Sequence, residues 1–86
     1  ATALAMGRKL KDLARDRQVF CVTHLPQVAA FADTHYVVRR EVNTAAVEEL
    51  EGTARVEELS RMLAGLPDSD RGRAHAEELL KMAGTA

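Results

Sequence analysis

The expected fold is decided by the stretch Val19-Phe20-Cys21-Val22-Thr23-His24-Leu25-Pro26-Gln27-Val28-Ala29-Ala30. Its four apolar residues, 19–22, are bounded by Gln18 and Thr23, a pattern typical of a strand buried on both faces of a parallel sheet. A short helix is expected over 26–32, because Pro26 suits a first helical position. Ligands of open α/β sheets bind outside the carboxyl ends of strands, and the pattern predicts that His24 lies at such an end.

Length, charge and cysteine content limit what the chain can be. Its 86 residues make at most one small domain, expected to be a single partial domain over 1–86, and a chain this short buries only roughly 60% of its unfolded surface. Twelve Lys and Arg against thirteen Asp and Glu exclude a broad basic surface for nucleic acid. Cys21 has no partner for a disulfide and lies in an apolar run, which predicts a reducing compartment and a buried, unreactive thiol. The sequence contains no apolar stretch of bilayer-spanning length, and export by a signal of its own is not expected.

The rest of the first half alternates helix and strand. An amphipathic helix is expected over 3–16, and Gly7 beside its apolar stripe predicts close packing against a sheet. Strands are expected over 35–41 and 44–51, joined by a turn at Asn43 and Thr44 into a small edge hairpin; the second segment also fits a helix. The helical stripe is Ala3, Met6, Leu10, Leu13 and Ala14. This alternation predicts an α/β fold, and a strand is expected upstream of the first helix.

Two helices are predicted in the second half. The first runs over 54–64, with Thr53 as its N-cap and a stop signal at Gly65-Leu66-Pro67. The second begins after Ser69, another N-cap, and ends near residue 83. Their apolar stripes are Val56, Leu59, Met62 and Leu63 in the first and Ala76, Leu79, Leu80 and Ala83 in the second.

His24 is the residue with the strongest case for chemistry. The chain has no Gly-rich phosphate loop and no nucleophile elbow, so a self-contained enzyme is not expected. Cys21 and His24 have the spacing of half a metal site, but no second close pair completes it, and no metal is predicted. Thr23 and His24 precede a helix start, where backbone amides favour an anion, and an imidazole can donate a hydrogen bond to a phosphate oxygen. A structural role for His24 is the alternative.

These residues also carry a resemblance to a known family. Residues 18–33, with His24 followed by Leu-Pro-Gln-Val-Ala-Ala, resemble the switch-histidine segment of the RecN family, the SMC-like ABC ATPases of bacterial DNA repair. Residues 55–65 and 74–80 resemble the C-terminal helices of that family. Residues 41–53 contain nothing distinctive of it. The resemblance covers nearly the whole chain.

The resemblance implies the C-terminal part of an ABC-type P-loop ATPase head, with a parallel-strand core flanked by helices. Such a head binds ATP with Mg²⁺ and acts in recombinational repair of DNA double-strand breaks. His24 would be the catalytic switch histidine at the γ-phosphate, and Thr23 would lie beside it in the nucleotide site. The implied partners are the N-terminal part of the same head, a second head across the ATP, and DNA through the complete protein.

The resemblance also implies a cytoplasmic, nucleoid-associated protein without membrane contact. The phosphate loop, the signature motif and the catalytic Glu of the family all precede this segment, so the segment alone is expected to be inactive. The rival hypothesis is a non-catalytic helical interaction or dimerisation module. In that case His24 is a structural cap, and the helices over 54–64 and 70–83 bind a partner.

Overall fold

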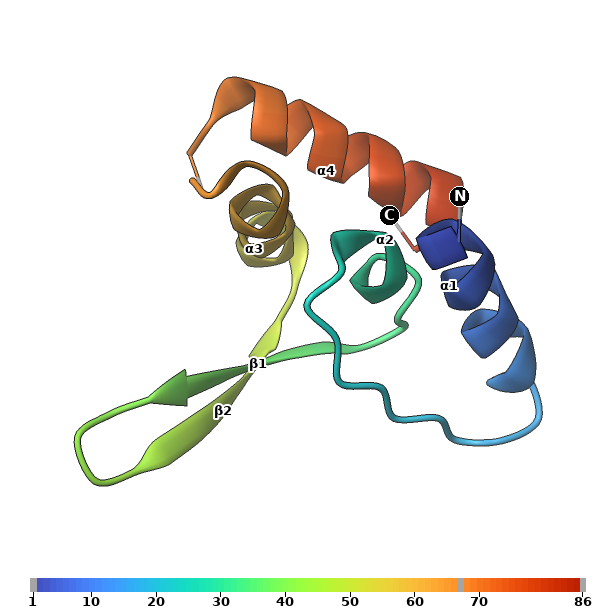
Figure 1. The fold of residues 1–86 in the computed structure, drawn as a ribbon, viewed down its shortest axis with the longest axis horizontal. Coiled ribbons are helices and arrows are strands. Elements are labelled where there is room, and N and C mark those ends of the chain that lie inside the picture. The colour runs from blue at the N-terminus through green and yellow to red at the C-terminus, as the bar shows by residue number, and fades with distance from the viewer. Residues whose placement is uncertain (1, 67, 86) are drawn as a thin grey trace.

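The computed structural model describes residues 2–66 and 68–85. Its elements are α1 (Thr2–Leu13), α2 (Pro26–Ala29), β1 (His35–Arg40), β2 (Ala45–Leu50), α3 (Gly52–Ala64) and α4 (Asp70–Ala83). The helices gather on one side, and the β1–β2 hairpin projects away from them (Figure 1). Among the described residues, no helix is long and apolar enough to cross a membrane.

The predicted edge hairpin is confirmed. Strands β1 and β2 pair antiparallel, with Val38 opposite Val47 and Arg40 opposite Ala45. The turn closes where the backbone N–H of Glu41 donates to the carbonyl of Thr44, at 2.8 Å. Most of the hairpin is exposed, and the two strands form a sheet with each other alone in the part of the chain that is described.

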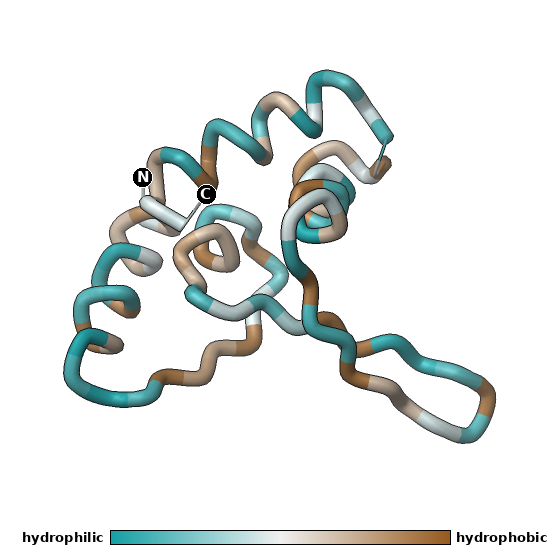
Figure 2. Tube along the Cα trace, turned by 180° about the vertical axis from the view of Figure 1, so that it is seen from behind, coloured by the Kyte–Doolittle hydropathy of each residue, from teal (hydrophilic) through white to brown (hydrophobic). Residues whose placement is uncertain are grey.

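The strand predicted over 19–22 is wrong for this structure. The segment is an irregular connection between α1 and α2, in which Phe20 is 81% exposed and Val22 fully exposed. Figure 2 shows it as a hydrophobic run of the tube between these helices. The predicted burial of Cys21 is also wrong, because its thiol is exposed. A strand buried on both faces needs a hydrogen-bonded neighbour at its edges and a layer on each side, and the described residues supply neither.

The two C-terminal helices are confirmed, with one difference at a cap. Ser69 caps α4, because its hydroxyl accepts from the backbone N–H of Gly72 at 3.2 Å. Gly65 ends α3 in the left-handed conformation, with φ 79°, which glycine adopts without steric cost. Thr53 is not an N-cap, since α3 begins at Gly52, two residues before the predicted start, and Glu51 takes the N-cap position. Pro67, which belongs to the predicted stop signal, lies outside the described residues.

The core lies where α2 and the turn after it meet α3 and α4. Its buried residues are Ala29, Ala30, Phe31, Leu59, Ala76, Leu79, Leu80 and Ala83. The stripe predicted on α1 contributes little, because Met6 and Leu13 are exposed while Leu4 packs against the core. Close approach at Gly7 is confirmed, but its neighbour is a helix and the residues after it rather than a sheet. A Cβ there would lie 2.9 Å from Phe31 Cε2 and 3.0 Å from the Gln27 carbonyl.

Candidate functional site

Thr23 and His24 form a bend immediately before α2. His24 is exposed, and Thr23 is half-buried. The hydroxyl oxygen of Thr23 accepts a hydrogen bond from the backbone N–H of Leu25, at 3.0 Å, which leaves the hydroxyl proton available for another acceptor. Pro26 starts α2 at the predicted position. The bend therefore presents an imidazole and a hydroxyl at the entry to the helix.

The helix that follows this bend is short and buried. Pro26, Val28 and Ala29 of α2 are all buried, and its backbone closes where the N–H of Ala30 donates to the Pro26 carbonyl at 2.9 Å. Phe31, directly after the turn, is buried close to Gly7 of α1. The exposed bend is thus attached to a single helical turn that the rest of the molecule encloses.

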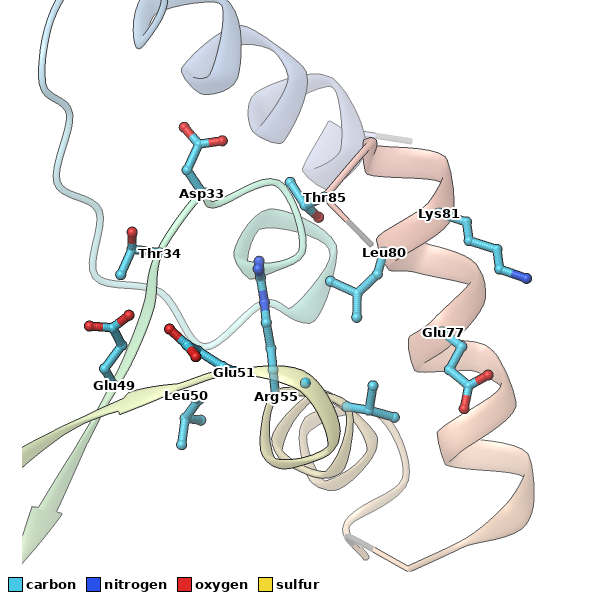
Figure 3. A pocket seen from close by; sticks show the side chains of 12 residues that line it. Asp33, Thr34, Glu49, Leu50, Glu51, Arg55, Glu77, Leu80, Lys81 and Thr85 are labelled. Atoms are coloured by element: carbon cyan, nitrogen blue, oxygen red, sulfur yellow. The ribbon is translucent and has the colours of Figure 1, made fainter.

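A buried polar contact ties this turn to α3. Arg55 is 8% exposed, and its Nη2 donates to the carbonyls of Ala29, Ala30 and Ala32 at 3.2, 3.4 and 2.6 Å. Figure 3 shows its side chain reaching from α3 toward the ribbon of α2 and the turn beyond it. The Nε atom is buried and has no hydrogen-bond partner among the described residues. Arg55 thus uses a buried cation to hold backbone carbonyls.

Burial and charge perturb the titratable groups around Arg55. Burial lowers the pKa of the Arg55 guanidinium, and the Asp33 carboxylate opposes that shift. Burial is also the main cause of a lowered pKa at His35, where the charge of Arg55 adds to the effect and that of Glu58 opposes it. The pKa of Glu58 is lowered mainly by its hydrogen bond from Arg61. His35 is therefore held in its neutral form, with its Nδ1 atom buried and unpartnered within the described part of the chain.

Arg55 also lines a pocket of about 430 Å³ between the base of the hairpin, α3 and α4 (Figure 3). Leu50, Val56 and Leu80 supply its apolar lining. Its acidic residues are Asp33, Glu49, Glu51 and Glu77. Neither Thr23 nor His24 lines this pocket, so the predicted site and the hollow are separate features.

Sequence reasoning did not identify Arg55, although a signal was present. Arg55 lies four residues before Leu59 and therefore on the buried face of α3. A charged residue in that position predicts a buried hydrogen-bonding role. For metals, the described residues contain no group of three or more His, Cys, Asp or Glu side chains that could hold an ion.

Comparisons with known proteins connect this chain to one kind of protein. It is 58% identical over 83 residues to DNA repair protein RecN of Mycobacterium tuberculosis. It is 56% identical to that of Streptomyces coelicolor and 42% identical to that of Bacillus subtilis, in each case over 85 residues. No protein-family model matches the chain. Over 94% of its length, the chain is thus similar to DNA repair protein RecN, of whose length it spans 14–15%.

Proposed function

We propose that this chain is the C-terminal part of a RecN-type, SMC-like ATPase head that acts in recombinational repair of DNA double-strand breaks, and that His24 is its switch histidine. The observation that carries the proposal is the exposed bend at Thr23 and His24, set on a buried helical turn within a sequence up to 58% identical to RecN.

The bend has the donors that a phosphate requires. An N–H of the His24 imidazole can donate a hydrogen bond to a phosphate oxygen. The Thr23 hydroxyl can donate another, since its oxygen is engaged only as an acceptor from Leu25. In the complete head, ATP supplies the γ-phosphoryl group that is transferred to water. Phosphoryl transfer depends on positioning and charge stabilisation, and His24 would contact the γ-phosphate and help to orient the water. Proton abstraction would fall to a carboxylate of the preceding part of the head.

The exposed apolar side chains support a partner whose strands would pair with segment 19–22. Phe20 and Val22 are almost wholly exposed in the apolar segment 19–22, and Met6 of α1 is about half exposed. Neighbouring strands from the N-terminal part of the head would give this segment its ladder partners and bury its side chains. The same arrangement would create the parallel-strand core and place His24 at the carboxyl end of a strand.

The remaining parts of the proposal belong to the complete protein. Two heads would enclose ATP between them as a homodimer, and DNA would bind outside this segment, whose net charge is −1. Of the two side chains in the bend, only that of Thr23 has an oxygen atom that could bind a metal ion. The protein ligands of Mg²⁺ would therefore come from the preceding part of the head. We place the protein in the cytoplasm, in association with the nucleoid.

The test is ATP turnover by the complete head at saturating ATP. His24→Ala should lower kcat by about 100-fold or more, the typical cost of losing one contact to a developing transition-state charge. His75→Ala is the matched control, because His75 is an exposed histidine on α4 and should leave kcat unchanged. Unchanged turnover in folded His24→Ala protein would refute the proposal and favour the interaction module, in which His24 is a structural cap.

A further inference from the structure

We propose that Arg55 is a positioning residue for His24: its guanidinium fixes the carboxyl end of α2 and thereby the bend that carries the histidine. The inference rests on the proposed function of His24 and adds a residue from a distant part of the chain to that site. All three contacts of Arg55 with this turn are side chain to backbone, and they join residues 23 to 26 positions apart in sequence.

The contact matches what the end of a helix lacks. The last carbonyls of an α-helix have no donors within the helix. In α2 the Ala29 carbonyl accepts from the N–H of Ala32, whereas the Ala32 carbonyl has no described donor other than Arg55. The Nη2 of Arg55 donates to carbonyls at this end and in the turn directly after it. The described residues include no ion pair that involves Arg55, so the guanidinium charge is directed at these carbonyls rather than at a carboxylate.

Burial makes the contact hard to replace. Arg55 is 8% exposed. The Ala29 carbonyl also accepts from the backbone N–H of Ala32 at 3.1 Å and the Ala30 carbonyl from the Thr85 hydroxyl, so among the described residues Arg55 is the sole donor only to the half-buried Ala32 carbonyl. A buried acceptor without a donor is more costly than the net value of its hydrogen bond. The turn must then shift toward another donor or toward solvent, and both movements displace α2.

Because α2 is short, a displacement of its carboxyl end also moves His24 at the other end. The helix has one turn, Pro26–Ala29, so its two ends move together. The apolar core also joins the turn to α3, where Ala29, Ala30 and Phe31 cluster with Leu59. Phe31 in addition lies against Gly7, and the Thr85 hydroxyl donates to the Ala30 carbonyl at 2.5 Å. Without Arg55 nothing described joins the turn to α3 by a side-chain hydrogen bond. A displacement of about 1 Å at a reacting group can cost about 100-fold in rate.

The chain offers a conservative variant and a matched control. All three bonds originate from one nitrogen, so Arg55→Lys supplies an ammonium with three N–H donors for the three carbonyls, whereas Arg55→Met keeps an apolar stem and removes every donor. Lys11→Met is the control, because Lys11 Nζ donates to the Ala83 carbonyl, at 3.0 Å, near the carboxyl end of α4. It removes the same kind of contact from a helix that does not carry the bend.

The test measures kcat and KM for ATP in the complete ATPase, with folding checked by circular dichroism. Arg55→Met should lower kcat about 10- to 100-fold, with little change in KM, Arg55→Lys should recover most of the loss, and Lys11→Met should have no effect on kcat. In a His24→Ala background, Arg55→Met should lower kcat no further, because the residue acts through His24. If Arg55→Met does not fold, Arg55→Gln takes its place in the same comparisons.

Three results would overturn the inference. They are an undiminished kcat in folded Arg55→Met protein, an equal loss in Lys11→Met protein, and a full further loss when Arg55→Met is added to His24→Ala. Each of these can occur while His24→Ala alone still abolishes turnover, in which case the proposed function stands. If His24→Ala alone leaves turnover unchanged, the proposed function itself fails.

Discussion

The close approach of α1 and the residues around α2 predicts that Gly7→Ala destabilises the chain. In an exposed helix this change stabilises, because alanine exceeds glycine in helix propensity by about 1 kcal/mol. Here the new methyl group would lie 2.9 Å from Phe31 Cε2, closer still to Phe31 Cδ2, and 3.0 Å from the backbone carbonyl of Gln27. Phe31 is 6% exposed, so its ring has little free space into which to move.

The two effects have opposite signs, and the steric one should win. Forcing an extra carbon into a well-packed site costs about 1–3 kcal/mol, and contact with both a buried ring and a backbone carbonyl places Gly7 in the upper half of that range. After subtraction of the propensity gain, we expect a net loss of about 1–2 kcal/mol in the free energy of unfolding.

Urea denaturation of the 86-residue chain, followed by far-ultraviolet circular dichroism, measures this difference. Ala5→Gly is the matched control: Ala5 is exposed on α1, so the variant reports propensity alone and should lose about 1 kcal/mol. If Gly7→Ala were instead more stable by about the amount that Ala5→Gly loses, α1 would not approach Phe31 as described, and the reasoning would be refuted.

Two further predictions concern a helix cap and a titrating side chain. Ser69→Ala should cost about 1 kcal/mol in urea denaturation because it removes the acceptor for the Gly72 N–H, whereas Thr53→Ala should lack that cap penalty because Thr53 is not an N-cap. The pKa of His35 in the folded chain is below its ordinary value of 6.5, so the unfolded chain binds the proton more readily. The stability due to neutral His35 is therefore complete above pH 6.5 and is lost as the pH falls through the folded pKa. Between pH 7.5 and a series of lower pH values, the unfolding midpoint should fall less in His35→Gln than in the native chain. An equal pH dependence of the two midpoints would contradict the assignment.

The elements that were predicted well depend on local signals. The hairpin follows from two short segments around Asn43 and Thr44, and α4 follows from its cap at Ser69 and its apolar spacing, both of which are read within a few residues. The segment 19–22 was predicted wrongly because its apolar pattern indicates a strand that other elements must bury, and those elements are not part of the local sequence. Such a strand exists only when neighbouring strands and covering helices are present.

The candidate site likewise has one part that local sequence signals predict and one part that they do not. The position of His24 before Pro26 is a local property, and it agrees with the sequence prediction of a helix start. The contact of Arg55 with the end of α2 joins residues more than twenty positions apart, and spacing along the chain gives no measure of which carbonyls a side chain will reach. Arg55 could have been suspected from its place on the buried face of α3, but its acceptors could not.

The sequence by itself determined the start of α2 at Pro26, the end of α3 at Gly65, the cap of α4 at Ser69 and the hairpin, because capping, turn geometry and apolar periodicity act between neighbours in the chain. Only the tertiary structure decided that Gly7 meets Phe31, that Arg55 holds the turn of α2 and that residues 20–22 lie exposed. The physical reason is that burial and long-range hydrogen bonds depend on which surfaces meet. That outcome is set by the packing of all elements together and not by any one segment.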